Sequence, residues 1–140
     1  MDKALDRIFD PLRKKYVKLT PEEAVRQLFI RFLVGQRNFP ESHMVSEYVM
    51  KLNGMQRRAD IVVFNRELKP VLIVECKAQS VRLDDPEVAR QVFEQALHYH
   101  SSIGAKVIVI TNATTTFAIS LHGDGTFTML KDIPSYEDLH

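Results

Sequence analysis

The chain has 140 residues, of which 45% are hydrophobic and 26% charged, and its formal net charge is +1. These values are typical of one globular domain with its own core, and they exclude a disordered or fibrous chain. No apolar run approaches the roughly 20 residues of a membrane helix, and no signal-peptide pattern opens the sequence. With Cys76 as the single cysteine, we expect a cytoplasmic protein without disulfides, without a C-x-x-C zinc site and without a membrane attachment.

Residues 1–19 carry a weak amphipathic pattern that Pro11 interrupts. We expect an arm or a short helix there, followed by a single domain over residues 20–140. Several basic residues gather between positions 13 and 18, and the simplest interpretation is a solvated surface. We assign no chemistry to this segment.

The first helix is expected from about residue 21 to residue 35, ending near Gly35. Thr20 is placed to be its N-cap, Pro21 suits its first position, and apolar residues then recur at helical spacing. Glu23 has two interpretations that do not exclude each other. It completes a capping box with Thr20, or it adds a carboxylate to a site at the adjacent sheet.

Strands are expected over residues 44–52, 58–64 and 70–77, with a turn at Asn53-Gly54 and a loop over residues 66–69. In the antiparallel pair that this loop allows, Asp60 faces Glu75. Because side chains alternate along a strand, we expect two apolar faces. The face shared with the carboxylates comprises Val62, Phe64, Val71 and Ile73, and the opposite face comprises Ile61, Val63, Leu72, Val74 and Cys76.

The pair Asp60 and Glu75, with Lys77 on the same face, is the candidate site. Two carboxylates this close repel unless a proton or a cation lies between them. Mg²⁺ prefers such oxygen ligands, and a lysine beside it can stabilise an attacking hydroxide. The spacing therefore indicates a phosphodiesterase centre. The alternative is a buried Glu75–Lys77 ion pair with Asp60 at a strand end, and a register slip of one residue would turn Asp60 away.

A second helix is expected from residue 86, with Asp85 as its cap. Gln95 and Tyr99 lie one turn apart, where they can hold a lysine, a water or a phosphate, or simply form a solvated face. We assign no role to His98 or His100. A strand over residues 106–111 would lie parallel to the Glu75 strand after a right-handed crossover, and strands over 114–121 and 126–130 form a terminal hairpin.

The predicted fold is therefore α/β, with a mixed central sheet flanked by helices. Four motifs occur on it in order: TPEEAVRQ at 20–27, RADIV at 58–62, VECKA at 74–78 and QALHY at 95–99. Together they resemble the PD-(D/E)xK nuclease superfamily, with its restriction-endonuclease-like sandwich. More narrowly, they are similar to the N-terminal nuclease domain of type I restriction enzyme R subunits, including small stand-alone bacterial forms.

The resemblance implies a Mg²⁺- or Mn²⁺-dependent endodeoxyribonuclease of restriction-modification systems, acting on DNA. It implies Asp60, Glu75 and the main-chain carbonyl of Cys76 as metal ligands, and Lys77 as the catalytic lysine. It also implies Glu23 as the helix-borne acid. Two further residues, Gln95 and Tyr99, match the Q-x-x-x-Y motif of the family and belong to the expected catalytic set.

Basic residues near the hairpin are candidates for phosphate contacts, which position DNA without reading its sequence; they are Lys51, Arg57 and Arg58. Cutting both strands of a duplex favours a homodimer or a partner motor or specificity protein. Two other functions stay open at this point. The chain is a non-catalytic nucleic-acid-binding module that keeps the fold, or it cleaves RNA or branched DNA.

Overall fold

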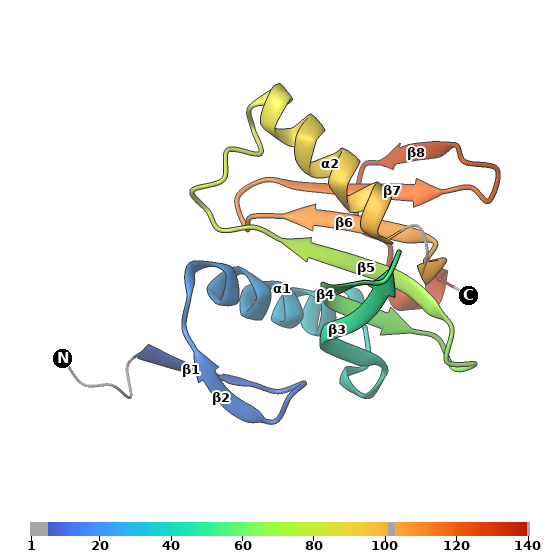
Figure 1. The fold of residues 1–140 in the computed structure, drawn as a ribbon. Helices are drawn as coiled ribbons and strands as arrows, with labels where there is room; N and C mark the ends of the chain where they lie inside the picture. Colours follow the sequence, from blue (N-terminus) through green and yellow to red (C-terminus); the bar gives the residue numbers. More distant parts are fainter. Residues whose placement is uncertain (1–5, 101–102, 140) are drawn as a thin grey trace.

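The computed structural model describes residues 6–100 and 103–139, apart from the side chains of Leu52 and Tyr99. A six-stranded mixed sheet forms its centre, with strand order β3-β4-β5-β6-β7-β8 (Figure 1). The strands are β3 (Met44–Leu52), β4 (Met55–Phe64), β5 (Pro70–Cys76), β6 (Val107–Thr111), β7 (Thr116–Leu121) and β8 (Phe127–Leu130). Two 3-10 helices, η2 (Glu41–His43) and η4 (Tyr136–Asp138), complete this part of the chain.

The strand connections follow the predicted topology. β3, β4 and β5 form an antiparallel meander, and β5 then pairs with β6 in parallel across the second helix. β7 and β8 add the expected antiparallel hairpin. The Asn53-Gly54 turn has left-handed backbone at both positions, with φ of 53° and 77°, which matches the twist that a two-residue hairpin needs.

Helix α1 (Pro21–Arg37) begins as expected, because the Thr20 hydroxyl accepts the Glu23 amide at 3.1 Å. The predicted end near Gly35 is wrong, since the helix continues to Arg37 and is capped by Asn38 in the left-handed conformation, with φ of 61°. A glycine inside a helix costs only about 1 kcal/mol, so packing carries the helix past Gly35. The left-handed cap ends it instead.

Helices α1 and α2 (Pro86–His100) cover opposite faces of the sheet. Along β6, Val107 and Val109 pack in the cluster under α1, whereas Ile108 and Ile110 pack in the cluster under α2. This alternation explains why the central strands are apolar at consecutive positions. None of the helices among the described residues is long and apolar enough to cross a membrane.

One residue was assigned to the wrong face. Val71 packs in the cluster under α1, together with Ile61 and Val63, rather than on the carboxylate face. The pairing shifts between Val63 and Phe64, so that β5 carries an extra residue at Val71. The bulge shifts the register by one residue on the turn side, whereas the pairs from Val63 and Leu72 towards Asp60 and Glu75 keep the predicted register.

The N-terminal segment forms a hairpin rather than a helix. β1 (Arg7–Asp10) and β2 (Lys15–Lys18) pair antiparallel in a two-stranded sheet separate from the main one. Figure 1 shows this hairpin beside the first turns of α1, away from the six-stranded sheet. The expected short helix is therefore wrong for these residues, and positions 1–5 of the expected arm lie outside the described residues.

Candidate active site

Asp60 and Glu75 lie opposite each other where β4 and β5 part. The neighbouring pair in the ladder is Ile61 with Val74, so the predicted register is confirmed. The Oδ2 atom of Asp60 accepts the backbone N–H of Cys76 at 2.8 Å. A side-chain oxygen thus takes the place of a strand carbonyl, which fixes the Asp60 carboxylate at the end of β5.

The two carboxylates have opposite electrostatic surroundings. Burial and the negative charge of Glu75 raise the pKa of Asp60 to about 6, although Arg26 and the Cys76 amide act against them. Burial also opposes ionisation of Glu75, but the hydrogen bond from His100 and the charge of Lys77 outweigh it, and the pKa of Glu75 is lowered. The repulsion between the two groups is what a cation between them would relieve.

On the α1 side, the guanidinium of Arg26 joins three carboxylates. Its Nη1 lies 2.5 Å from Glu23, and its Nη2 lies 2.7 Å from Glu47 and 2.7 Å from Asp60. Only 7% of the Arg26 side chain is exposed. Arg26 therefore supplies, from within the chain, much of the positive charge that these acids require.

The Glu23 side chain contacts this network instead of completing the capping box at the start of its own helix. Its Oε1 accepts from Arg13 at 2.7 Å, and its Oε2 accepts from Gln27 at 2.9 Å. The backbone N–H of Thr20 donates to Lys18 instead, at 3.2 Å. Half of the capping box forms, while the carboxylate joins the cluster around Asp60.

Glu47 is a member of the cluster that the sequence interpretation did not include. Its backbone is left-handed, with φ of 58°, which is uncommon for a residue other than glycine and often marks a functional position. The ladder between β3 and β4 pairs Ser46 with Ile61 and Tyr48 with Ala59, and skips Glu47 and Asp60. A local signal was available, because the two-residue Asn53-Gly54 turn sets a register in which Glu47 lies opposite Asp60.

On the α2 side, His100 and Lys77 contact Glu75. The Nε2 atom of His100 lies 3.2 Å from Oε1, and the Nζ atom of Lys77 lies 4.0 Å from Oε2. His100 is buried, with 1% exposed, and the sequence interpretation gave it no role. One signal was available, because His100 lies one helical turn beyond the buried Ala96.

The remaining predicted site residues differ in placement. Gln95 is exposed on α2, and no hydrogen bond to the carboxylates is present in the part of the chain that the structure describes. The Tyr99 side chain lies outside the described part. Arg58 is 65% exposed and donates to Glu47 at 3.1 Å, whereas Lys51 and the half-buried Arg57 lie farther along the β3–β4 ribbon.

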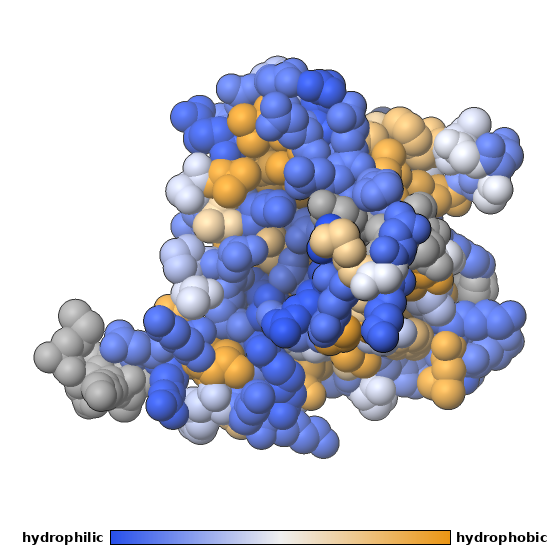
Figure 2. Space-filling model, viewed as in Figure 1, coloured by the Kyte–Doolittle hydropathy of each residue, from blue (hydrophilic) through white to orange (hydrophobic). Residues whose placement is uncertain are grey.

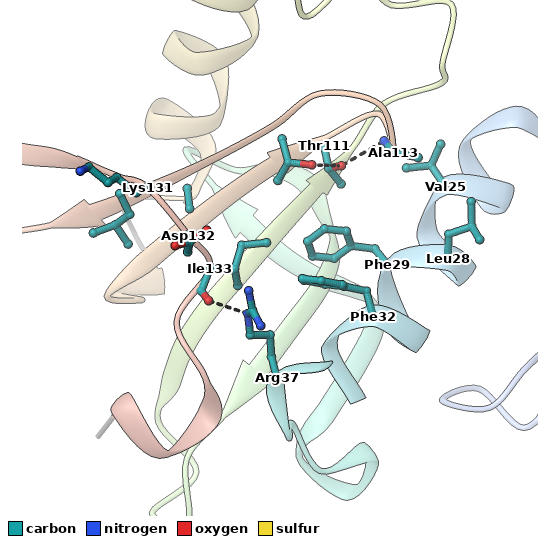
Figure 3. Close-up of a pocket in the computed structure, with 13 residues that line it drawn as sticks. Val25, Leu28, Phe29, Phe32, Arg37, Thr111, Ala113, Lys131, Asp132 and Ile133 are labelled. Carbon is teal, nitrogen blue, oxygen red and sulfur yellow. Dashed lines mark hydrogen bonds between the residues drawn. The ribbon is translucent and has the colours of Figure 1, made fainter. Parts of the chain in front are cut away.

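A separate cavity of about 450 Å³ lies between α1 and the strands β6 to β8. Figure 3 shows Phe29 and Phe32 projecting from α1 into it, and Arg37 donating to the Ile133 carbonyl at 2.8 Å. Its lining is largely apolar, and none of the predicted site residues contributes to it. The carboxylate cluster and this cavity are therefore different features.

The described side chains contain no group of three or more histidine, cysteine, aspartate or glutamate residues arranged to hold a metal ion. What the cluster offers is a pair of opposed carboxylates, a lysine beside one of them, and an arginine network that supports the other. Carboxylate oxygens and a strand-end carbonyl are ligands for a hard divalent cation.

The order of elements and the acidic strand pair define a restriction-endonuclease-like α/β domain. Residues 21–134 match the family described as the type I restriction enzyme R protein N terminus. The chain belongs to this family.

One solved structure with the same fold is described as a fragment of a putative HsdR subunit of a type I restriction enzyme from Vibrio vulnificus YJ016. It is 22% identical in sequence, with a TM-score of 0.58. The match covers 86% of the present chain but only 24% of that chain, so this protein corresponds to about a quarter of its length. A search of curated proteins gave no match.

Proposed function

We propose that the protein is a metal-dependent nuclease that hydrolyses DNA phosphodiester bonds. The main support is the opposition of Asp60 and Glu75 at the strand ends, where burial and mutual repulsion raise the pKa of Asp60 to about 6. Lys77 extends next to Glu75. Membership of the restriction R-subunit family supports the same activity, and we propose that the protein acts in the cytoplasm.

The residues present fit a divalent cation, Mg²⁺ or Mn²⁺. We propose Asp60, Glu75 and the main-chain carbonyl of Cys76 as its ligands, because hard cations take carboxylate and carbonyl oxygens. When bound, the ion would supply a lowered pKa for an attacking water and charge stabilisation on the phosphate. Its positive charge would also relieve the repulsion between the two carboxylates.

Each protein residue in this proposal has its own task. Lys77 holds the attacking water or hydroxide and offsets negative charge on the phosphate. Arg26 and the Cys76 amide keep Asp60 in place, and His100 does the same for Glu75. Following the family motif, we propose that Gln95 and Tyr99 orient Lys77 or the substrate.

The test is incubation of the protein with supercoiled, linear and single-stranded DNA, and with RNA, in Mn²⁺, Mg²⁺ or EDTA. Cleavage that requires the metal and disappears in Glu75→Ala would support the nuclease and identify its substrate. Mn²⁺ should also raise the melting temperature by mass action, and Glu75→Ala should remove that rise. Cleavage that persists in EDTA would contradict the proposed chemistry.

Lys77→Ala separates chemistry from binding. We expect loss of cleavage with nearly unchanged DNA affinity, because Lys77 acts on the reacting phosphate and is one of many cations that attract the backbone. The matched variant is Lys69→Ala, since Lys69 lies at the β4–β5 turn and its side chain is 74% exposed. An equal loss of binding and cleavage in Lys77→Ala would argue against the catalytic role.

A non-catalytic DNA-binding module is the second candidate. It is favoured by Arg26, which pairs with Asp60 at 2.7 Å and holds this carboxylate by a contact within the chain. In that case, cleavage would depend on a partner motor or specificity protein, or on a second copy of the chain. Mn²⁺-dependent stabilisation without cleavage would indicate a missing partner, and the absence of both would favour the binding module.

A further inference from the structure

The β1–β2 hairpin precedes the residues that match the family, which begin at residue 21. Its register pairs Arg7 with Lys18 and Phe9 with Tyr16. Because side chains alternate along each strand, these four residues share one face of the hairpin. We call this surface the outer face, since all four of its side chains are exposed.

The opposite face is anchored to the body of the protein. Ile8 and Val17 are half-buried there, and Asp10 is fully buried. Asp10 accepts the Leu12 amide at 2.8 Å and forms an ion pair with Arg13. Those two contacts lie within the hairpin itself. Its link to the body is the hydrogen bond from Arg13 to Glu23 of α1 at 2.7 Å, and the face with the buried residues is turned towards the protein.

The outer face carries aromatic rings that an ordinary hairpin would turn inward. Phe9 is 45% exposed and Tyr16 is 67% exposed. The two rings pack edge to face, with centroids 5.3 Å apart. This contact stabilises the hairpin, but it leaves most of the Tyr16 ring in water while the smaller Ile8 and Val17 face the protein.

The charges on this face are also unbalanced. Arg7 and Lys18 are directly opposite each other, and like charges in that position destabilise a strand pair. Neither forms an ion pair within the described part of the chain, and the exposed Lys14 in the turn adds further positive charge, whereas Lys15 belongs to the opposite face by the same alternation. An anion shared by Arg7 and Lys18 would remove the repulsion.

We propose that the outer face is a DNA-binding arm that contacts the phosphate backbone. Two-stranded ribbons fit the grooves of duplex DNA, cations on them contact phosphates, and exposed rings can pack against sugars or bases. This inference rests on the proposed nuclease function, and names the element that holds the substrate.

The hairpin is connected to the carboxylate cluster through a short series of contacts. Arg13, in the β1–β2 turn, donates to Glu23 at 2.7 Å. Glu23 and Asp60 both bind Arg26. Figure 1 places β1 and β2 next to the start of α1, and Figure 2 shows mostly hydrophilic residues over this region. DNA on the arm would therefore lie near Asp60.

The test compares two variants with the same change of charge. Arg7→Ala/Lys18→Ala removes an arginine and a lysine from the outer face. Arg66→Ala/Lys69→Ala removes the same residue types from the exposed β4–β5 turn, at the other end of that strand pair from Asp60 and Glu75. Fluorescence anisotropy would measure affinity for a labelled DNA duplex in EDTA, which prevents cleavage, from about 50 to 200 mM salt.

We expect the outer-face variant to bind DNA on the order of tenfold more weakly, with a salt slope reduced by about 0.9 for each phosphate that the variant no longer neutralises. The turn variant should keep the affinity and slope of the unchanged protein. Tyr16→Ser should weaken binding without altering the slope. Unchanged melting temperatures would show that each variant is folded.

Equal effects of the two double variants on DNA affinity, or no effect of either, would contradict the proposal that the outer face binds DNA. The same conclusion would follow if the protein bound anionic lipid vesicles but no DNA. Because binding in EDTA is independent of cleavage, failure of the two proposals is distinguishable. If the chain binds DNA through the outer face but does not cleave it, the proposed DNA-binding arm stands and the proposed nuclease function is wrong.

Discussion

Each helix carries an arginine that joins acidic side chains, but the two surroundings differ. Arg26 on α1 binds Glu23 and two acids from other elements, and 7% of its side chain is exposed. Arg90 on α2 binds Glu87 and Glu94 of its own helix, and 53% of its side chain is exposed. The bonding patterns look alike, yet the side chains of the second network are far more exposed to water.

Burying the charged side chains of the α1 network costs desolvation free energy, whereas the exposed charged side chains on α2 lose almost no hydration. Removing a charge from water is unfavourable by several kcal/mol, and a partner offsets this only with good geometry. An exposed pair gains little and loses little. The α1 network thus contributes little net stability for its size, but it holds Asp60 and Glu23 in a fixed place beside Glu75.

The largest effect is expected for Arg26→Ala. It leaves three acids without their shared cation, and breaking a buried ion pair from one side typically costs about 3–5 kcal/mol. Urea denaturation in EDTA would measure the free energy of unfolding. Mn²⁺ should restore part of the loss in the variant, because a bound cation replaces the missing charge. A loss below about 1 kcal/mol would show that Arg26 is not the main partner of these acids.

A slightly smaller effect is expected in the pH dependence of stability. The pKa of Asp60 is about 6 in the folded protein against an ordinary value of 3.8. The folded state therefore binds the Asp60 proton more tightly than the unfolded state does. The stabilisation of the folded state by this bound proton is complete below pH 3.8 and is lost as the pH rises through 6. A difference of about two pH units corresponds to about 3 kcal/mol.

Asp60→Asn isolates this contribution. In EDTA, the stability of the unchanged protein relative to Asp60→Asn should fall between about pH 4 and pH 7, as the raised pKa requires. Chemical denaturation across that range would measure it. Glu75, whose pKa is lowered, titrates in the opposite sense and is present in both proteins. A difference in stability between the two proteins that does not change with pH would mean that burial does not raise the pKa of Asp60.

A modest effect is expected for His100→Leu. The change puts an apolar side chain of similar size in place of the imidazole and removes the hydrogen bond to the Glu75 carboxylate, which is worth about 1.5–3 kcal/mol because the acceptor is charged. The cost is limited because Nδ1 of His100 is buried without a hydrogen-bond partner in the described structure. The Mn²⁺ concentration needed for stabilisation should rise, since Glu75 loses its support. If the Mn²⁺ concentration needed for stabilisation does not change, His100 is not part of the metal site.

The smallest effect is expected for Arg90→Ala, the matched control for Arg26→Ala. Arg90 is exposed and its partners lie on the same helix, so thermal unfolding should show almost no change. Cleavage and Mn²⁺ stabilisation should also stay as they are. A loss comparable with that of Arg26→Ala would contradict the difference between the two helices.

Local patterns were sufficient for much of the fold and for the centre of the site. The apolar runs around Asp60 and Glu75 gave the correct register at that pair, although Phe64 and Pro70 close the turn and the bulge at Val71 compensates for its extra residue. Thr20 and Asp85 marked the two helix starts correctly. Errors occurred at Val71, where the bulge has no clear local pattern, and at Asn38, where an asparagine after Arg37 and before Pro40 is a helix end signal that Gly35 obscured.

The order of helices and strands and the opposition of Asp60 and Glu75 could be read from local patterns, because they depend on residues close together along the chain or joined by one turn. The mixed sheet followed from the crossover through α2, which brings β5 and β6 side by side in parallel. The positions of Arg26 and His100 became visible only in the folded structure, because Arg26 lies 34 residues from Asp60 and His100 lies 25 residues from Glu75. Burial, rather than residue type, gives the interactions of these charges their strength.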